Sequence, residues 1–208
     1  MTRPAKRAKV EATPVAELVR RSIARRVHQQ RPVHFAGLDL SLTGTGLVVV
    51  DDTGAVVHHA TYAAPKNLYA SMPARHDALR HSILAACTAH DPAVLAVEGY
   101  AFGAKNNREQ AGELGGLVRW ALWREQWPYF DVAPTALKRF VTGKGNAPKD
   151  VILKEVFKRW AFDTSDNNQA DAYGLARLAL HVWSNALVSL AAPDCPVIFE
   201  PNGHGALE

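Results

Sequence analysis

After residue 32 the chain carries three short apolar runs that are separated by glycine-containing, polar stretches. The runs cover 33–40, 44–50 and 55–62, and an Asp-Asp-Thr-Gly stretch at 51–54 joins the last two. Apolar, β-branched runs of this length joined by such a turn are typical of hairpin-connected strands. The pattern therefore predicts three consecutive antiparallel strands, the first of which ends near Asp39.

Beyond residue 70, helical spacing of apolar residues alternates with short buried-strand runs. We predict a helix over 71–90, a strand over 93–98, a helix over about 108–127, a strand over 130–133, and helices over about 134–141, 149–161 and 168–186. Strands that alternate with helices pair in parallel, so this order predicts an α/β domain with a mixed sheet.

Both ends of the chain depart from this pattern. Residues 1–31 contain nine Lys or Arg and two acids, and residues 14–29 within them have the spacing of a short amphipathic helix with an Arg-rich face. The last twenty-odd residues are rich in proline and glycine. We therefore divide the chain into a basic extension (1–31), a folded body (32–187) and an irregular tail (188–208).

The charge is unevenly distributed along the chain. The whole chain has a formal net charge of +4, whereas the extension alone carries +7, which leaves −3 for the remainder. A basic arm on a mildly acidic body predicts a polyanionic partner, because Lys and Arg displace counterions from phosphates. A targeting segment is the alternative interpretation.

Composition excludes several classes of protein. The chain has 208 residues, of which 48% are hydrophobic, so it is neither collagenous nor wholly disordered. Its two cysteines, Cys87 and Cys195, lack the spacing of a zinc site, and a reducing compartment fits them best. The apolar runs are far shorter than the ~20 residues of a membrane span. We expect a cytoplasmic protein.

Three acidic residues lie where local structure explains them poorly. Asp39 and Glu98 fall at the ends of two apolar strands, and Asp171 lies in a helix of small and apolar residues. A buried carboxylate needs a partner or a metal, because burying it alone costs several kcal/mol. Asp166 has a simpler interpretation, since Asp166-x-x-Gln169 fits the capping box at the start of a helix.

If the three acids converge, their chemistry is that of hard divalent cations. Carboxylates without a His or Cys set bind Mg²⁺ or Mn²⁺, and a pair of such ions can promote phosphodiester cleavage. The spacing alone is weak support, because many chains contain three well-placed acids.

At these acids the chain resembles the RuvC-type Holliday-junction resolvases of the RNase H-like nuclease superfamily. The most specific part is Gly-Lys-Gly-Asn-Ala-Pro-Lys at 143–149, followed by the Ala-Asp-Ala helix at 170–172. The matching blocks, in chain order, are 37–46, 97–100, 134–138, 142–149 and 168–172. The resemblance implies an RNase H-like nuclease domain over 32–187 with a mixed five-stranded sheet flanked by helices, three strands antiparallel and the others parallel.

The resemblance also implies an active site. In that family four acidic residues, sometimes with a His, hold two Mg²⁺ ions, for which Mn²⁺ may substitute. Carried over, Asp39 bridges the ions while Glu98 and Asp171 complete the shell. The fourth position holds Asn168, which shares a helix face with Asp171 but brings no charge. Asp166 is the alternative source of that charge.

Contacts with DNA are implied at two places. Tyr100, Phe102, Lys105 and Arg108 follow Glu98 as an aromatic and basic mixture that suits unpaired bases and phosphates at a junction centre. The alternative is that these aromatic rings merely hold the loop on the core. Basic side chains elsewhere are expected near phosphates: Lys138, Lys144 and Lys149.

The resemblance implies a homodimer, because a two-fold symmetric junction requires two symmetric nicks. Gly112 and Gly116 in the helix over 108–127 predict close packing against the sheet or a second subunit. Trp120, Trp123 and Trp127 form a stripe at helical spacing, which is typical of core.

Other functions remain open at this point. One is a nuclease for branched DNA in general, such as flaps and forks, and another is a junction-binding protein weakened by Asn168. The stretch 37–44 also resembles the first phosphate loop of actin-like and sugar-kinase ATPases, but no second such loop follows. A bacterial or phage nuclease would act in the cytoplasm, in the nucleoid or an infected cell, whereas import into an organelle would explain the basic extension.

Overall fold

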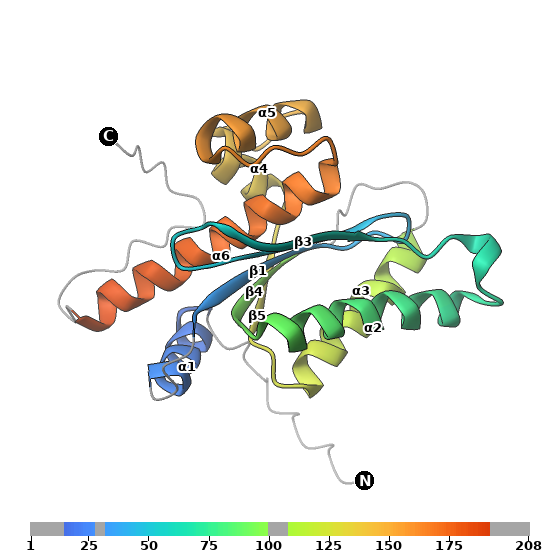
Figure 1. The fold of residues 1–208 in the computed structure, drawn as a ribbon, viewed down its shortest axis with the longest axis horizontal. Coiled ribbons are helices and arrows are strands. Elements are labelled where there is room, and N and C mark those ends of the chain that lie inside the picture. The colour runs from blue at the N-terminus through green and yellow to red at the C-terminus, as the bar shows by residue number, and fades with distance from the viewer. Residues whose placement is uncertain (1–14, 28–31, 100–107, 192–208) are drawn as a thin grey trace, which may run out of the picture.

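The computed structural model describes residues 15–27, 32–99 and 108–191, drawn in colour in Figure 1. A five-stranded sheet runs through the middle of the molecule with helices on both faces. This confirms the predicted α/β class with a mixed sheet. Three of the residues expected at DNA, Tyr100, Phe102 and Lys105, lie outside the described residues.

The strands are ordered β3-β2-β1-β4-β5 in the sheet. Their bounds are β1 His34–Asp39, β2 Thr45–Val50, β3 Val56–Tyr62, β4 Pro92–Glu98 and β5 Tyr129–Val132. The first three strands pair antiparallel, as predicted, because tight connections join them in sequence. β4 pairs parallel to both β1 and β5, since a helix returns the chain before each pairing.

The helices also follow the predicted segments. They are α1 Val15–Val27, α2 Met72–His90, α3 Arg108–Arg124, α4 Pro134–Thr142, α5 Lys149–Trp160 and α6 Asn167–Ala191, with a 3₁₀ turn at Lys66–Leu68. Ser71 caps α2 by accepting a hydrogen bond from the Ala74 N–H, and Gly143 ends α4 in the left-handed conformation. No helix in these described segments is long and apolar enough to cross a membrane.

Alternating side chains divide the core into two layers. Along β1, Phe35 packs in the cluster that includes α6, whereas Ala36 and Leu38 pack in the cluster formed with α2 and α3. A strand whose two faces are both covered by helices consists almost wholly of apolar residues, as β4 does. The alternation also fixes which face of the sheet receives each polar side chain at a strand end.

Two glycines let α6 lie directly on the sheet. A Cβ added to Gly37 would lie 1.9 Å from the Ala172 carbonyl oxygen, and one added to Gly46 would lie 2.1 Å from the Asn168 carbonyl oxygen. Only a residue without a side chain permits this approach. The contact holds the first turns of α6 against the ends of β1 and β2.

The predicted amphipathic helix of the N-terminal extension packs onto this body. In α1, Val19 and Ile23 are buried in the α6-side cluster. The Ser22 Oγ donates a hydrogen bond to the Ala93 carbonyl at 2.5 Å. Arg26 reaches Asp91, where Nη2 lies 2.7 Å from the carbonyl oxygen and 2.9 Å from Oδ1. The helix thus closes the N-terminal end of β4.

The tryptophans of α3 correct one expectation. Trp120 is 49% exposed and Trp123 is 63% exposed, so their prediction as core was wrong. Trp127, beyond the end of the helix, is partly buried beside the α2–α3 layer. Helical spacing finds a stripe but cannot say whether this chain or another covers it. Apart from adjacent residues and the backbone of α3 itself, no described atom lies within 4 Å of a Cβ added at Gly112 or Gly116.

Candidate active site

The carboxyl ends of β1 and β4 bring Asp39 and Glu98 together. The strands are neighbours in register, with Leu38 opposite Val97, and each acid follows directly. Counting by twos from Phe35 and Val94, both acids point to the α6 face of the sheet. Their side chains lie within hydrogen-bonding reach of one another.

Asp171 reaches the same place from α6. Its side chain is buried, one residue before Ala172, whose carbonyl lies against Gly37 of β1. The charges of both Glu98 and Asp171 act on Asp39. The structure therefore brings together all three acids that the sequence singled out.

The electrostatics of this cluster show that it has too much negative charge. Burial raises the pKa of Asp39 well above its usual range, and the hydrogen bond and charge of Glu98 and the charge of Asp171 raise it further. Burial and the Glu98 charge raise the pKa of Asp171 to about 6. Both shifts mean that a positive charge at this position would stabilise the ionised carboxylates.

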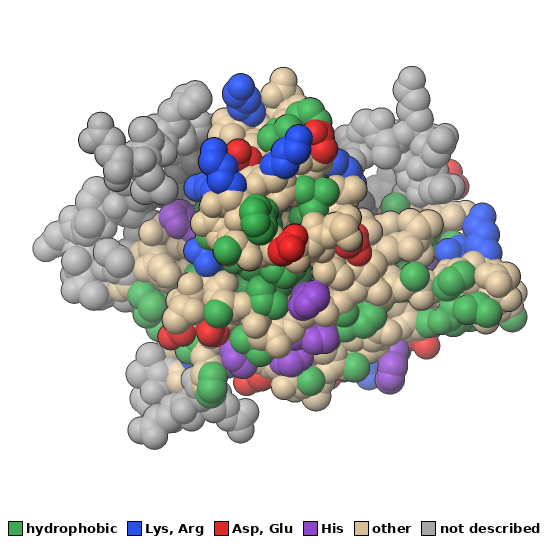
Figure 2. All heavy atoms as spheres, turned by 45° about the horizontal axis from the view of Figure 1, so that its top comes forward, with side chains coloured by type: hydrophobic (Ala, Val, Ile, Leu, Met, Phe, Trp, Pro, Cys, Tyr) green, Lys and Arg blue, Asp and Glu red, His purple; other side chains and the backbone are tan. Residues whose placement is uncertain are grey.

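Two lysines supply part of that charge. Lys149, at the start of α5, places Nζ 3.9 Å from Asp171 Oδ2. The charges of Lys149 and Lys138 both lower the pKa of Asp171, although less than burial and Glu98 raise it. Figure 2 shows Lys and Arg side chains gathered over α4 and α5, at the top of the view. Lys144 is exposed on the loop between these helices.

Asn168 and Asp166 take different positions at the start of α6. Asp166 is the cap, because Oδ1 accepts from the Asn168 N–H at 2.8 Å and Oδ2 accepts from the Thr61 hydroxyl. The cap bond goes to the N–H of Asn168 rather than of Gln169, so Asp166 caps the helix without the predicted capping box. The Gln169 Nε2 instead donates to Thr61 Oγ1 at 3.2 Å. The side chain of Asn168 lies beside Gly44, and its carbonyl lies beside Gly46, which is opposite Asp39 in register.

Sequence reasoning missed the residues that hold these elements in place. Thr61 on β3 binds both Asp166 and Gln169 and so fixes the start of α6. Arg119 on α3 donates to the Glu98 carbonyl oxygen at 2.9 Å. Neither residue belongs to a motif. A local sequence pattern does not predict a contact between residues that are 21 or more positions apart in the chain.

The donor set suits a hard divalent cation. It consists of three carboxylates, and Asn168 lies beside Gly46, the residue opposite Asp39 on β2. Among the described residues, no three His, Cys, Asp or Glu side chains are already arranged around a common point as metal ligands. Asp39 is instead hydrogen-bonded to Glu98, and Asp171 is beside Lys149. The chemistry of the residues fits a divalent cation, whose binding requires these side chains to turn toward it.

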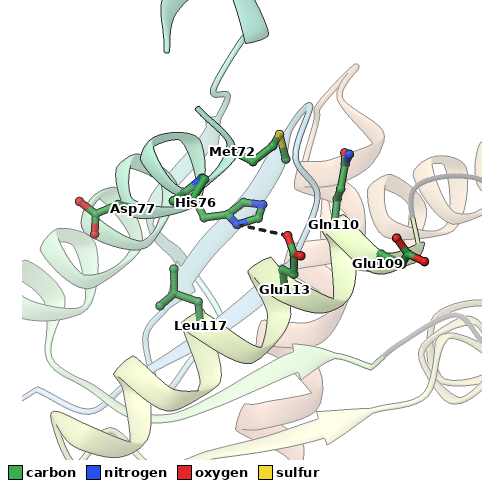
Figure 3. Close-up of a pocket in the computed structure, with 8 residues that line it drawn as sticks. Met72, His76, Asp77, Glu109, Gln110, Glu113 and Leu117 are labelled. Atoms are coloured by element: carbon green, nitrogen blue, oxygen red, sulfur yellow. Dashed lines mark ion pairs between the residues drawn. The ribbon is translucent and has the colours of Figure 1, made fainter. Parts of the chain in front are cut away.

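A separate hollow lies on the opposite face of the sheet, between α2 and α3. Figure 3 shows this cavity of about 730 Å³, with His76 and Glu113 facing each other across it and their Nδ1 and Oε2 atoms 4.0 Å apart. None of the three acids of the cluster lines it. A duplex arm is too large for such a hollow and requires an open surface, so the acid cluster is the stronger candidate for phosphodiester chemistry.

Comparison with known proteins points in the same direction. The family model for crossover junction endodeoxyribonuclease RuvC matches residues 35–178. A relative from Nocardia farcinica described by that name is 29% identical over 164 residues, which is 75% of this chain and 84% of that protein.

Solved structures share the fold. The RuvC structure from Thermus thermophilus superposes with a TM-score of 0.62 at 20% identity, over 75% of this chain and 97% of the other. The yeast mitochondrial Holliday junction resolvase Ydc2 gives 0.52 at 9% identity, over 84% of this chain and 92% of the other. These likenesses confirm the predicted RNase H-like architecture.

Proposed function

Since this chain belongs to the RuvC family of crossover junction endodeoxyribonucleases, we propose that Asp39, Glu98 and Asp171 form the active site with which it cleaves Holliday junctions. The family is one of divalent-metal-dependent junction-resolving nucleases, so the ATPase alternative has no support here. The observation that carries the assignment is the burial of Asp39 against two further acids from β4 and α6. Such crowding is unfavourable unless a cation binds.

The proposed cofactor is a pair of Mg²⁺ ions, for which Mn²⁺ may substitute. When bound, the ions supply an activated water and stabilise the negative charge at the leaving 3′ oxygen, so that each nick leaves a 5′-phosphate and a 3′-hydroxyl. Asp39, Glu98 and Asp171 would hold the ions, because the charges of Glu98 and Asp171 both act on Asp39. Lys149 is placed to hold a phosphate oxygen once a cation relieves it of its contact with Asp171.

We assign the fourth position of the site to Asn168. Both carboxylate oxygens of Asp166 already accept hydrogen bonds as the α6 cap, whereas the Asn168 side chain lies next to the end of β1 and β2. A neutral amide oxygen holds a cation less tightly than a carboxylate does. Asn168→Asp should therefore lower the Mg²⁺ concentration needed for cleavage, and Asp166→Asn should chiefly weaken the helix cap.

DNA is proposed to cross the α4–α5 end of the molecule. Lys138 and Lys149 lie there beside the acid cluster, and Lys144 is exposed on the loop between α4 and α5. Tyr100, Phe102 and Lys105, which lie between Glu98 and α3, and Arg108, the first residue of α3, are proposed to contact the junction centre. A nuclease of this kind acts where chromosomal or phage DNA recombines, so we place it in the cytoplasm.

A homodimer is proposed through the exposed face of α3. Trp120 and Trp123 are about half exposed or more, and Gly116, one turn before Trp120, leaves room for side chains of another molecule. Paired nicks in a two-fold symmetric substrate require two sites, and a C2 dimer supplies them. Replacing both tryptophans by Glu should give monomers in sedimentation experiments while the fold is retained.

The test compares a four-way junction, a flap and a linear duplex with Mg²⁺, Mn²⁺ or EDTA. Paired symmetric nicks in the junction that disappear in EDTA are the expected result. Equal cutting of flap and junction would change the substrate to branched DNA in general. Junction binding without any cutting would make this a catalytically weakened binding protein, and restoration by Asn168→Asp would identify the cause.

A further inference from the structure

Arg119 connects α3 to the end of the strand that carries Glu98. Its Nη2 donates to the Glu98 carbonyl oxygen at 2.9 Å, and its Nη1 donates to the Gly115 carbonyl at 3.1 Å. Nε donates to Asp131 Oδ1 of β5 at 2.8 Å, and Nη2 lies 2.7 Å from the same oxygen. The Arg119 side chain is only 12% exposed. One guanidinium thus joins a helix and two strands.

This contact occurs at the last residue of β4, beyond the pairing of β4 with β1. The pairing of β1 with β4 ends at Leu38 and Val97, so Glu98 has a register partner only on β5, at Val132. Glu98 is the last residue of its strand, and its carbonyl is bound by a side chain, Arg119. The orientation of the Glu98 side chain depends on the backbone at this point.

Arg119 acts from the opposite face of the sheet. Phe130 and Val132 of β5 belong to the α6-side cluster, so Asp131 between them points to the α3 side. The Glu98 side chain points to the α6 side, toward Asp39. Arg119 therefore binds the backbone from which the Glu98 carboxylate projects, from the face of the sheet opposite that carboxylate.

We propose that Arg119 is a positioning residue that fixes the end of β4 so that Glu98 meets Asp39 at the cation site. The proposal rests on the proposed function, because it presumes that these carboxylates bind a divalent metal. The planar fork of arginine suits the task, since it reaches Asp131 and the Glu98 carbonyl in one plane.

The experiment measures metal binding and cleavage separately. Mn²⁺ affinity of the full-length protein is determined by calorimetry without DNA, and junction cleavage is measured over a range of Mn²⁺ concentrations. Loss of a residue that orients a metal ligand typically costs about 10–100-fold in metal affinity or activity, and we expect Arg119→Ala to weaken Mn²⁺ binding by about that factor. Higher Mn²⁺ should restore part of the cleavage rate, and junction affinity in EDTA should not change.

Two further variants separate positioning from folding. Arg119→Lys keeps the charge but reaches one acceptor rather than two, so its Mn²⁺ affinity should fall between wild type and Arg119→Ala; it also serves if Arg119→Ala does not fold. Arg80→Ala is the matched control, because Arg80 forms the same two-nitrogen contact with Asp77 on α2, away from the acids. It should bind Mn²⁺ and cleave as wild type does.

The outcomes are distinct. If Arg119→Ala lowers the unfolding temperature but its folded form binds Mn²⁺ as wild type does, Arg119 is merely structural and the proposal is wrong. Wild type that binds Mn²⁺ but cuts no junction overturns the proposed function, and Arg119 is then judged by Mn²⁺ affinity alone. Wild type that binds no Mn²⁺ overturns both.

Discussion

The two ends of the central strands differ in whether their charged groups are paired with groups of opposite charge. At the N-terminal end of β4, α1 covers the strand, Ser22 binds a strand carbonyl, and Arg26 matches Asp91. At the carboxyl ends of β1 and β4, Asp39 and Glu98 face each other and Asp171 approaches from α6. One end has positive and negative groups in pairs, and the other has an excess of carboxylates.

This difference separates stability from function. Paired groups and the buried Val19 and Ile23 stabilise the fold at the α1 end. The crowded acids destabilise it in the absence of a cation, as their raised pKa values show. Carboxylates with strongly raised pKa values are typical of sites that bind a charged ligand. Substitutions at the two ends should therefore have opposite effects.

The largest effect is expected from Asp39→Asn. Cleavage of a four-way junction should fall by at least about 10³-fold, because the substitution removes the charge between the proposed metal positions. Junction binding in EDTA should persist, and the free energy of unfolding in EDTA at neutral pH should rise as repulsion from Glu98 and Asp171 disappears. Gel shift, cleavage and denaturant titration measure the three quantities. Retained cleavage would refute the site.

At the other end, Ile23→Ala should reduce stability and spare catalysis. Removing a buried Ile side chain costs about 2–5 kcal/mol. The cleavage rate per folded molecule should remain that of wild type, because α1 lies at the end of β4 opposite the acids. Arg20→Ala, on the exposed side of α1, is the control and should change the unfolding midpoint little. An unchanged midpoint for Ile23→Ala would show that α1 does not dock.

Asp171→Asn tests the charge at the acid end through the pH dependence of the free energy of unfolding. The pKa of Asp171 is about 6 in the folded protein against 3.8 ordinarily, so the unfolded chain gives up this proton more readily. Wild-type stability in EDTA should therefore fall as pH rises from about 4 to 6, and remain reduced above that range. Asn cannot ionise. The variant should be more stable than wild type by about 1–2 kcal/mol at pH 8, with a gain that shrinks toward pH 4. An equal gain at both pH values would contradict this cause.

The smallest effect is expected from the exposed arginines of α1. The basic extension predicts a polyanionic partner, yet α1 lies far along the strands from the acids. Replacing Arg20, Arg21 and Arg25 with Gln should leave the salt dependence of junction binding nearly unchanged. If all three contact phosphates, the slope of log K against log salt should become shallower by about 3. The variant keeps Arg26 and thus the docking of the helix.

Much of the fold was predictable because its signals are local. Apolar runs, the turn at 51–54 and the stops at helix ends predict the strands and most of the helices. The acids at the ends of β1 and β4 were predictable as a pair, since neighbouring parallel strands end at the same edge of a sheet. The ordered blocks around Asp39, Glu98 and Asp171 indicated the family as well.

What the sequence by itself determined was the type and order of the elements and the acidic chemistry at the strand ends. Only the tertiary structure decided that α1 docks on β4, that Trp120 and Trp123 stay exposed, and that Arg119 binds the Glu98 carbonyl from the opposite face of the sheet. Periodicity and capping depend on neighbours a few positions apart, which the sequence displays. Those other features depend on which surfaces meet across distant parts of the chain, and packing of the whole core selects among them.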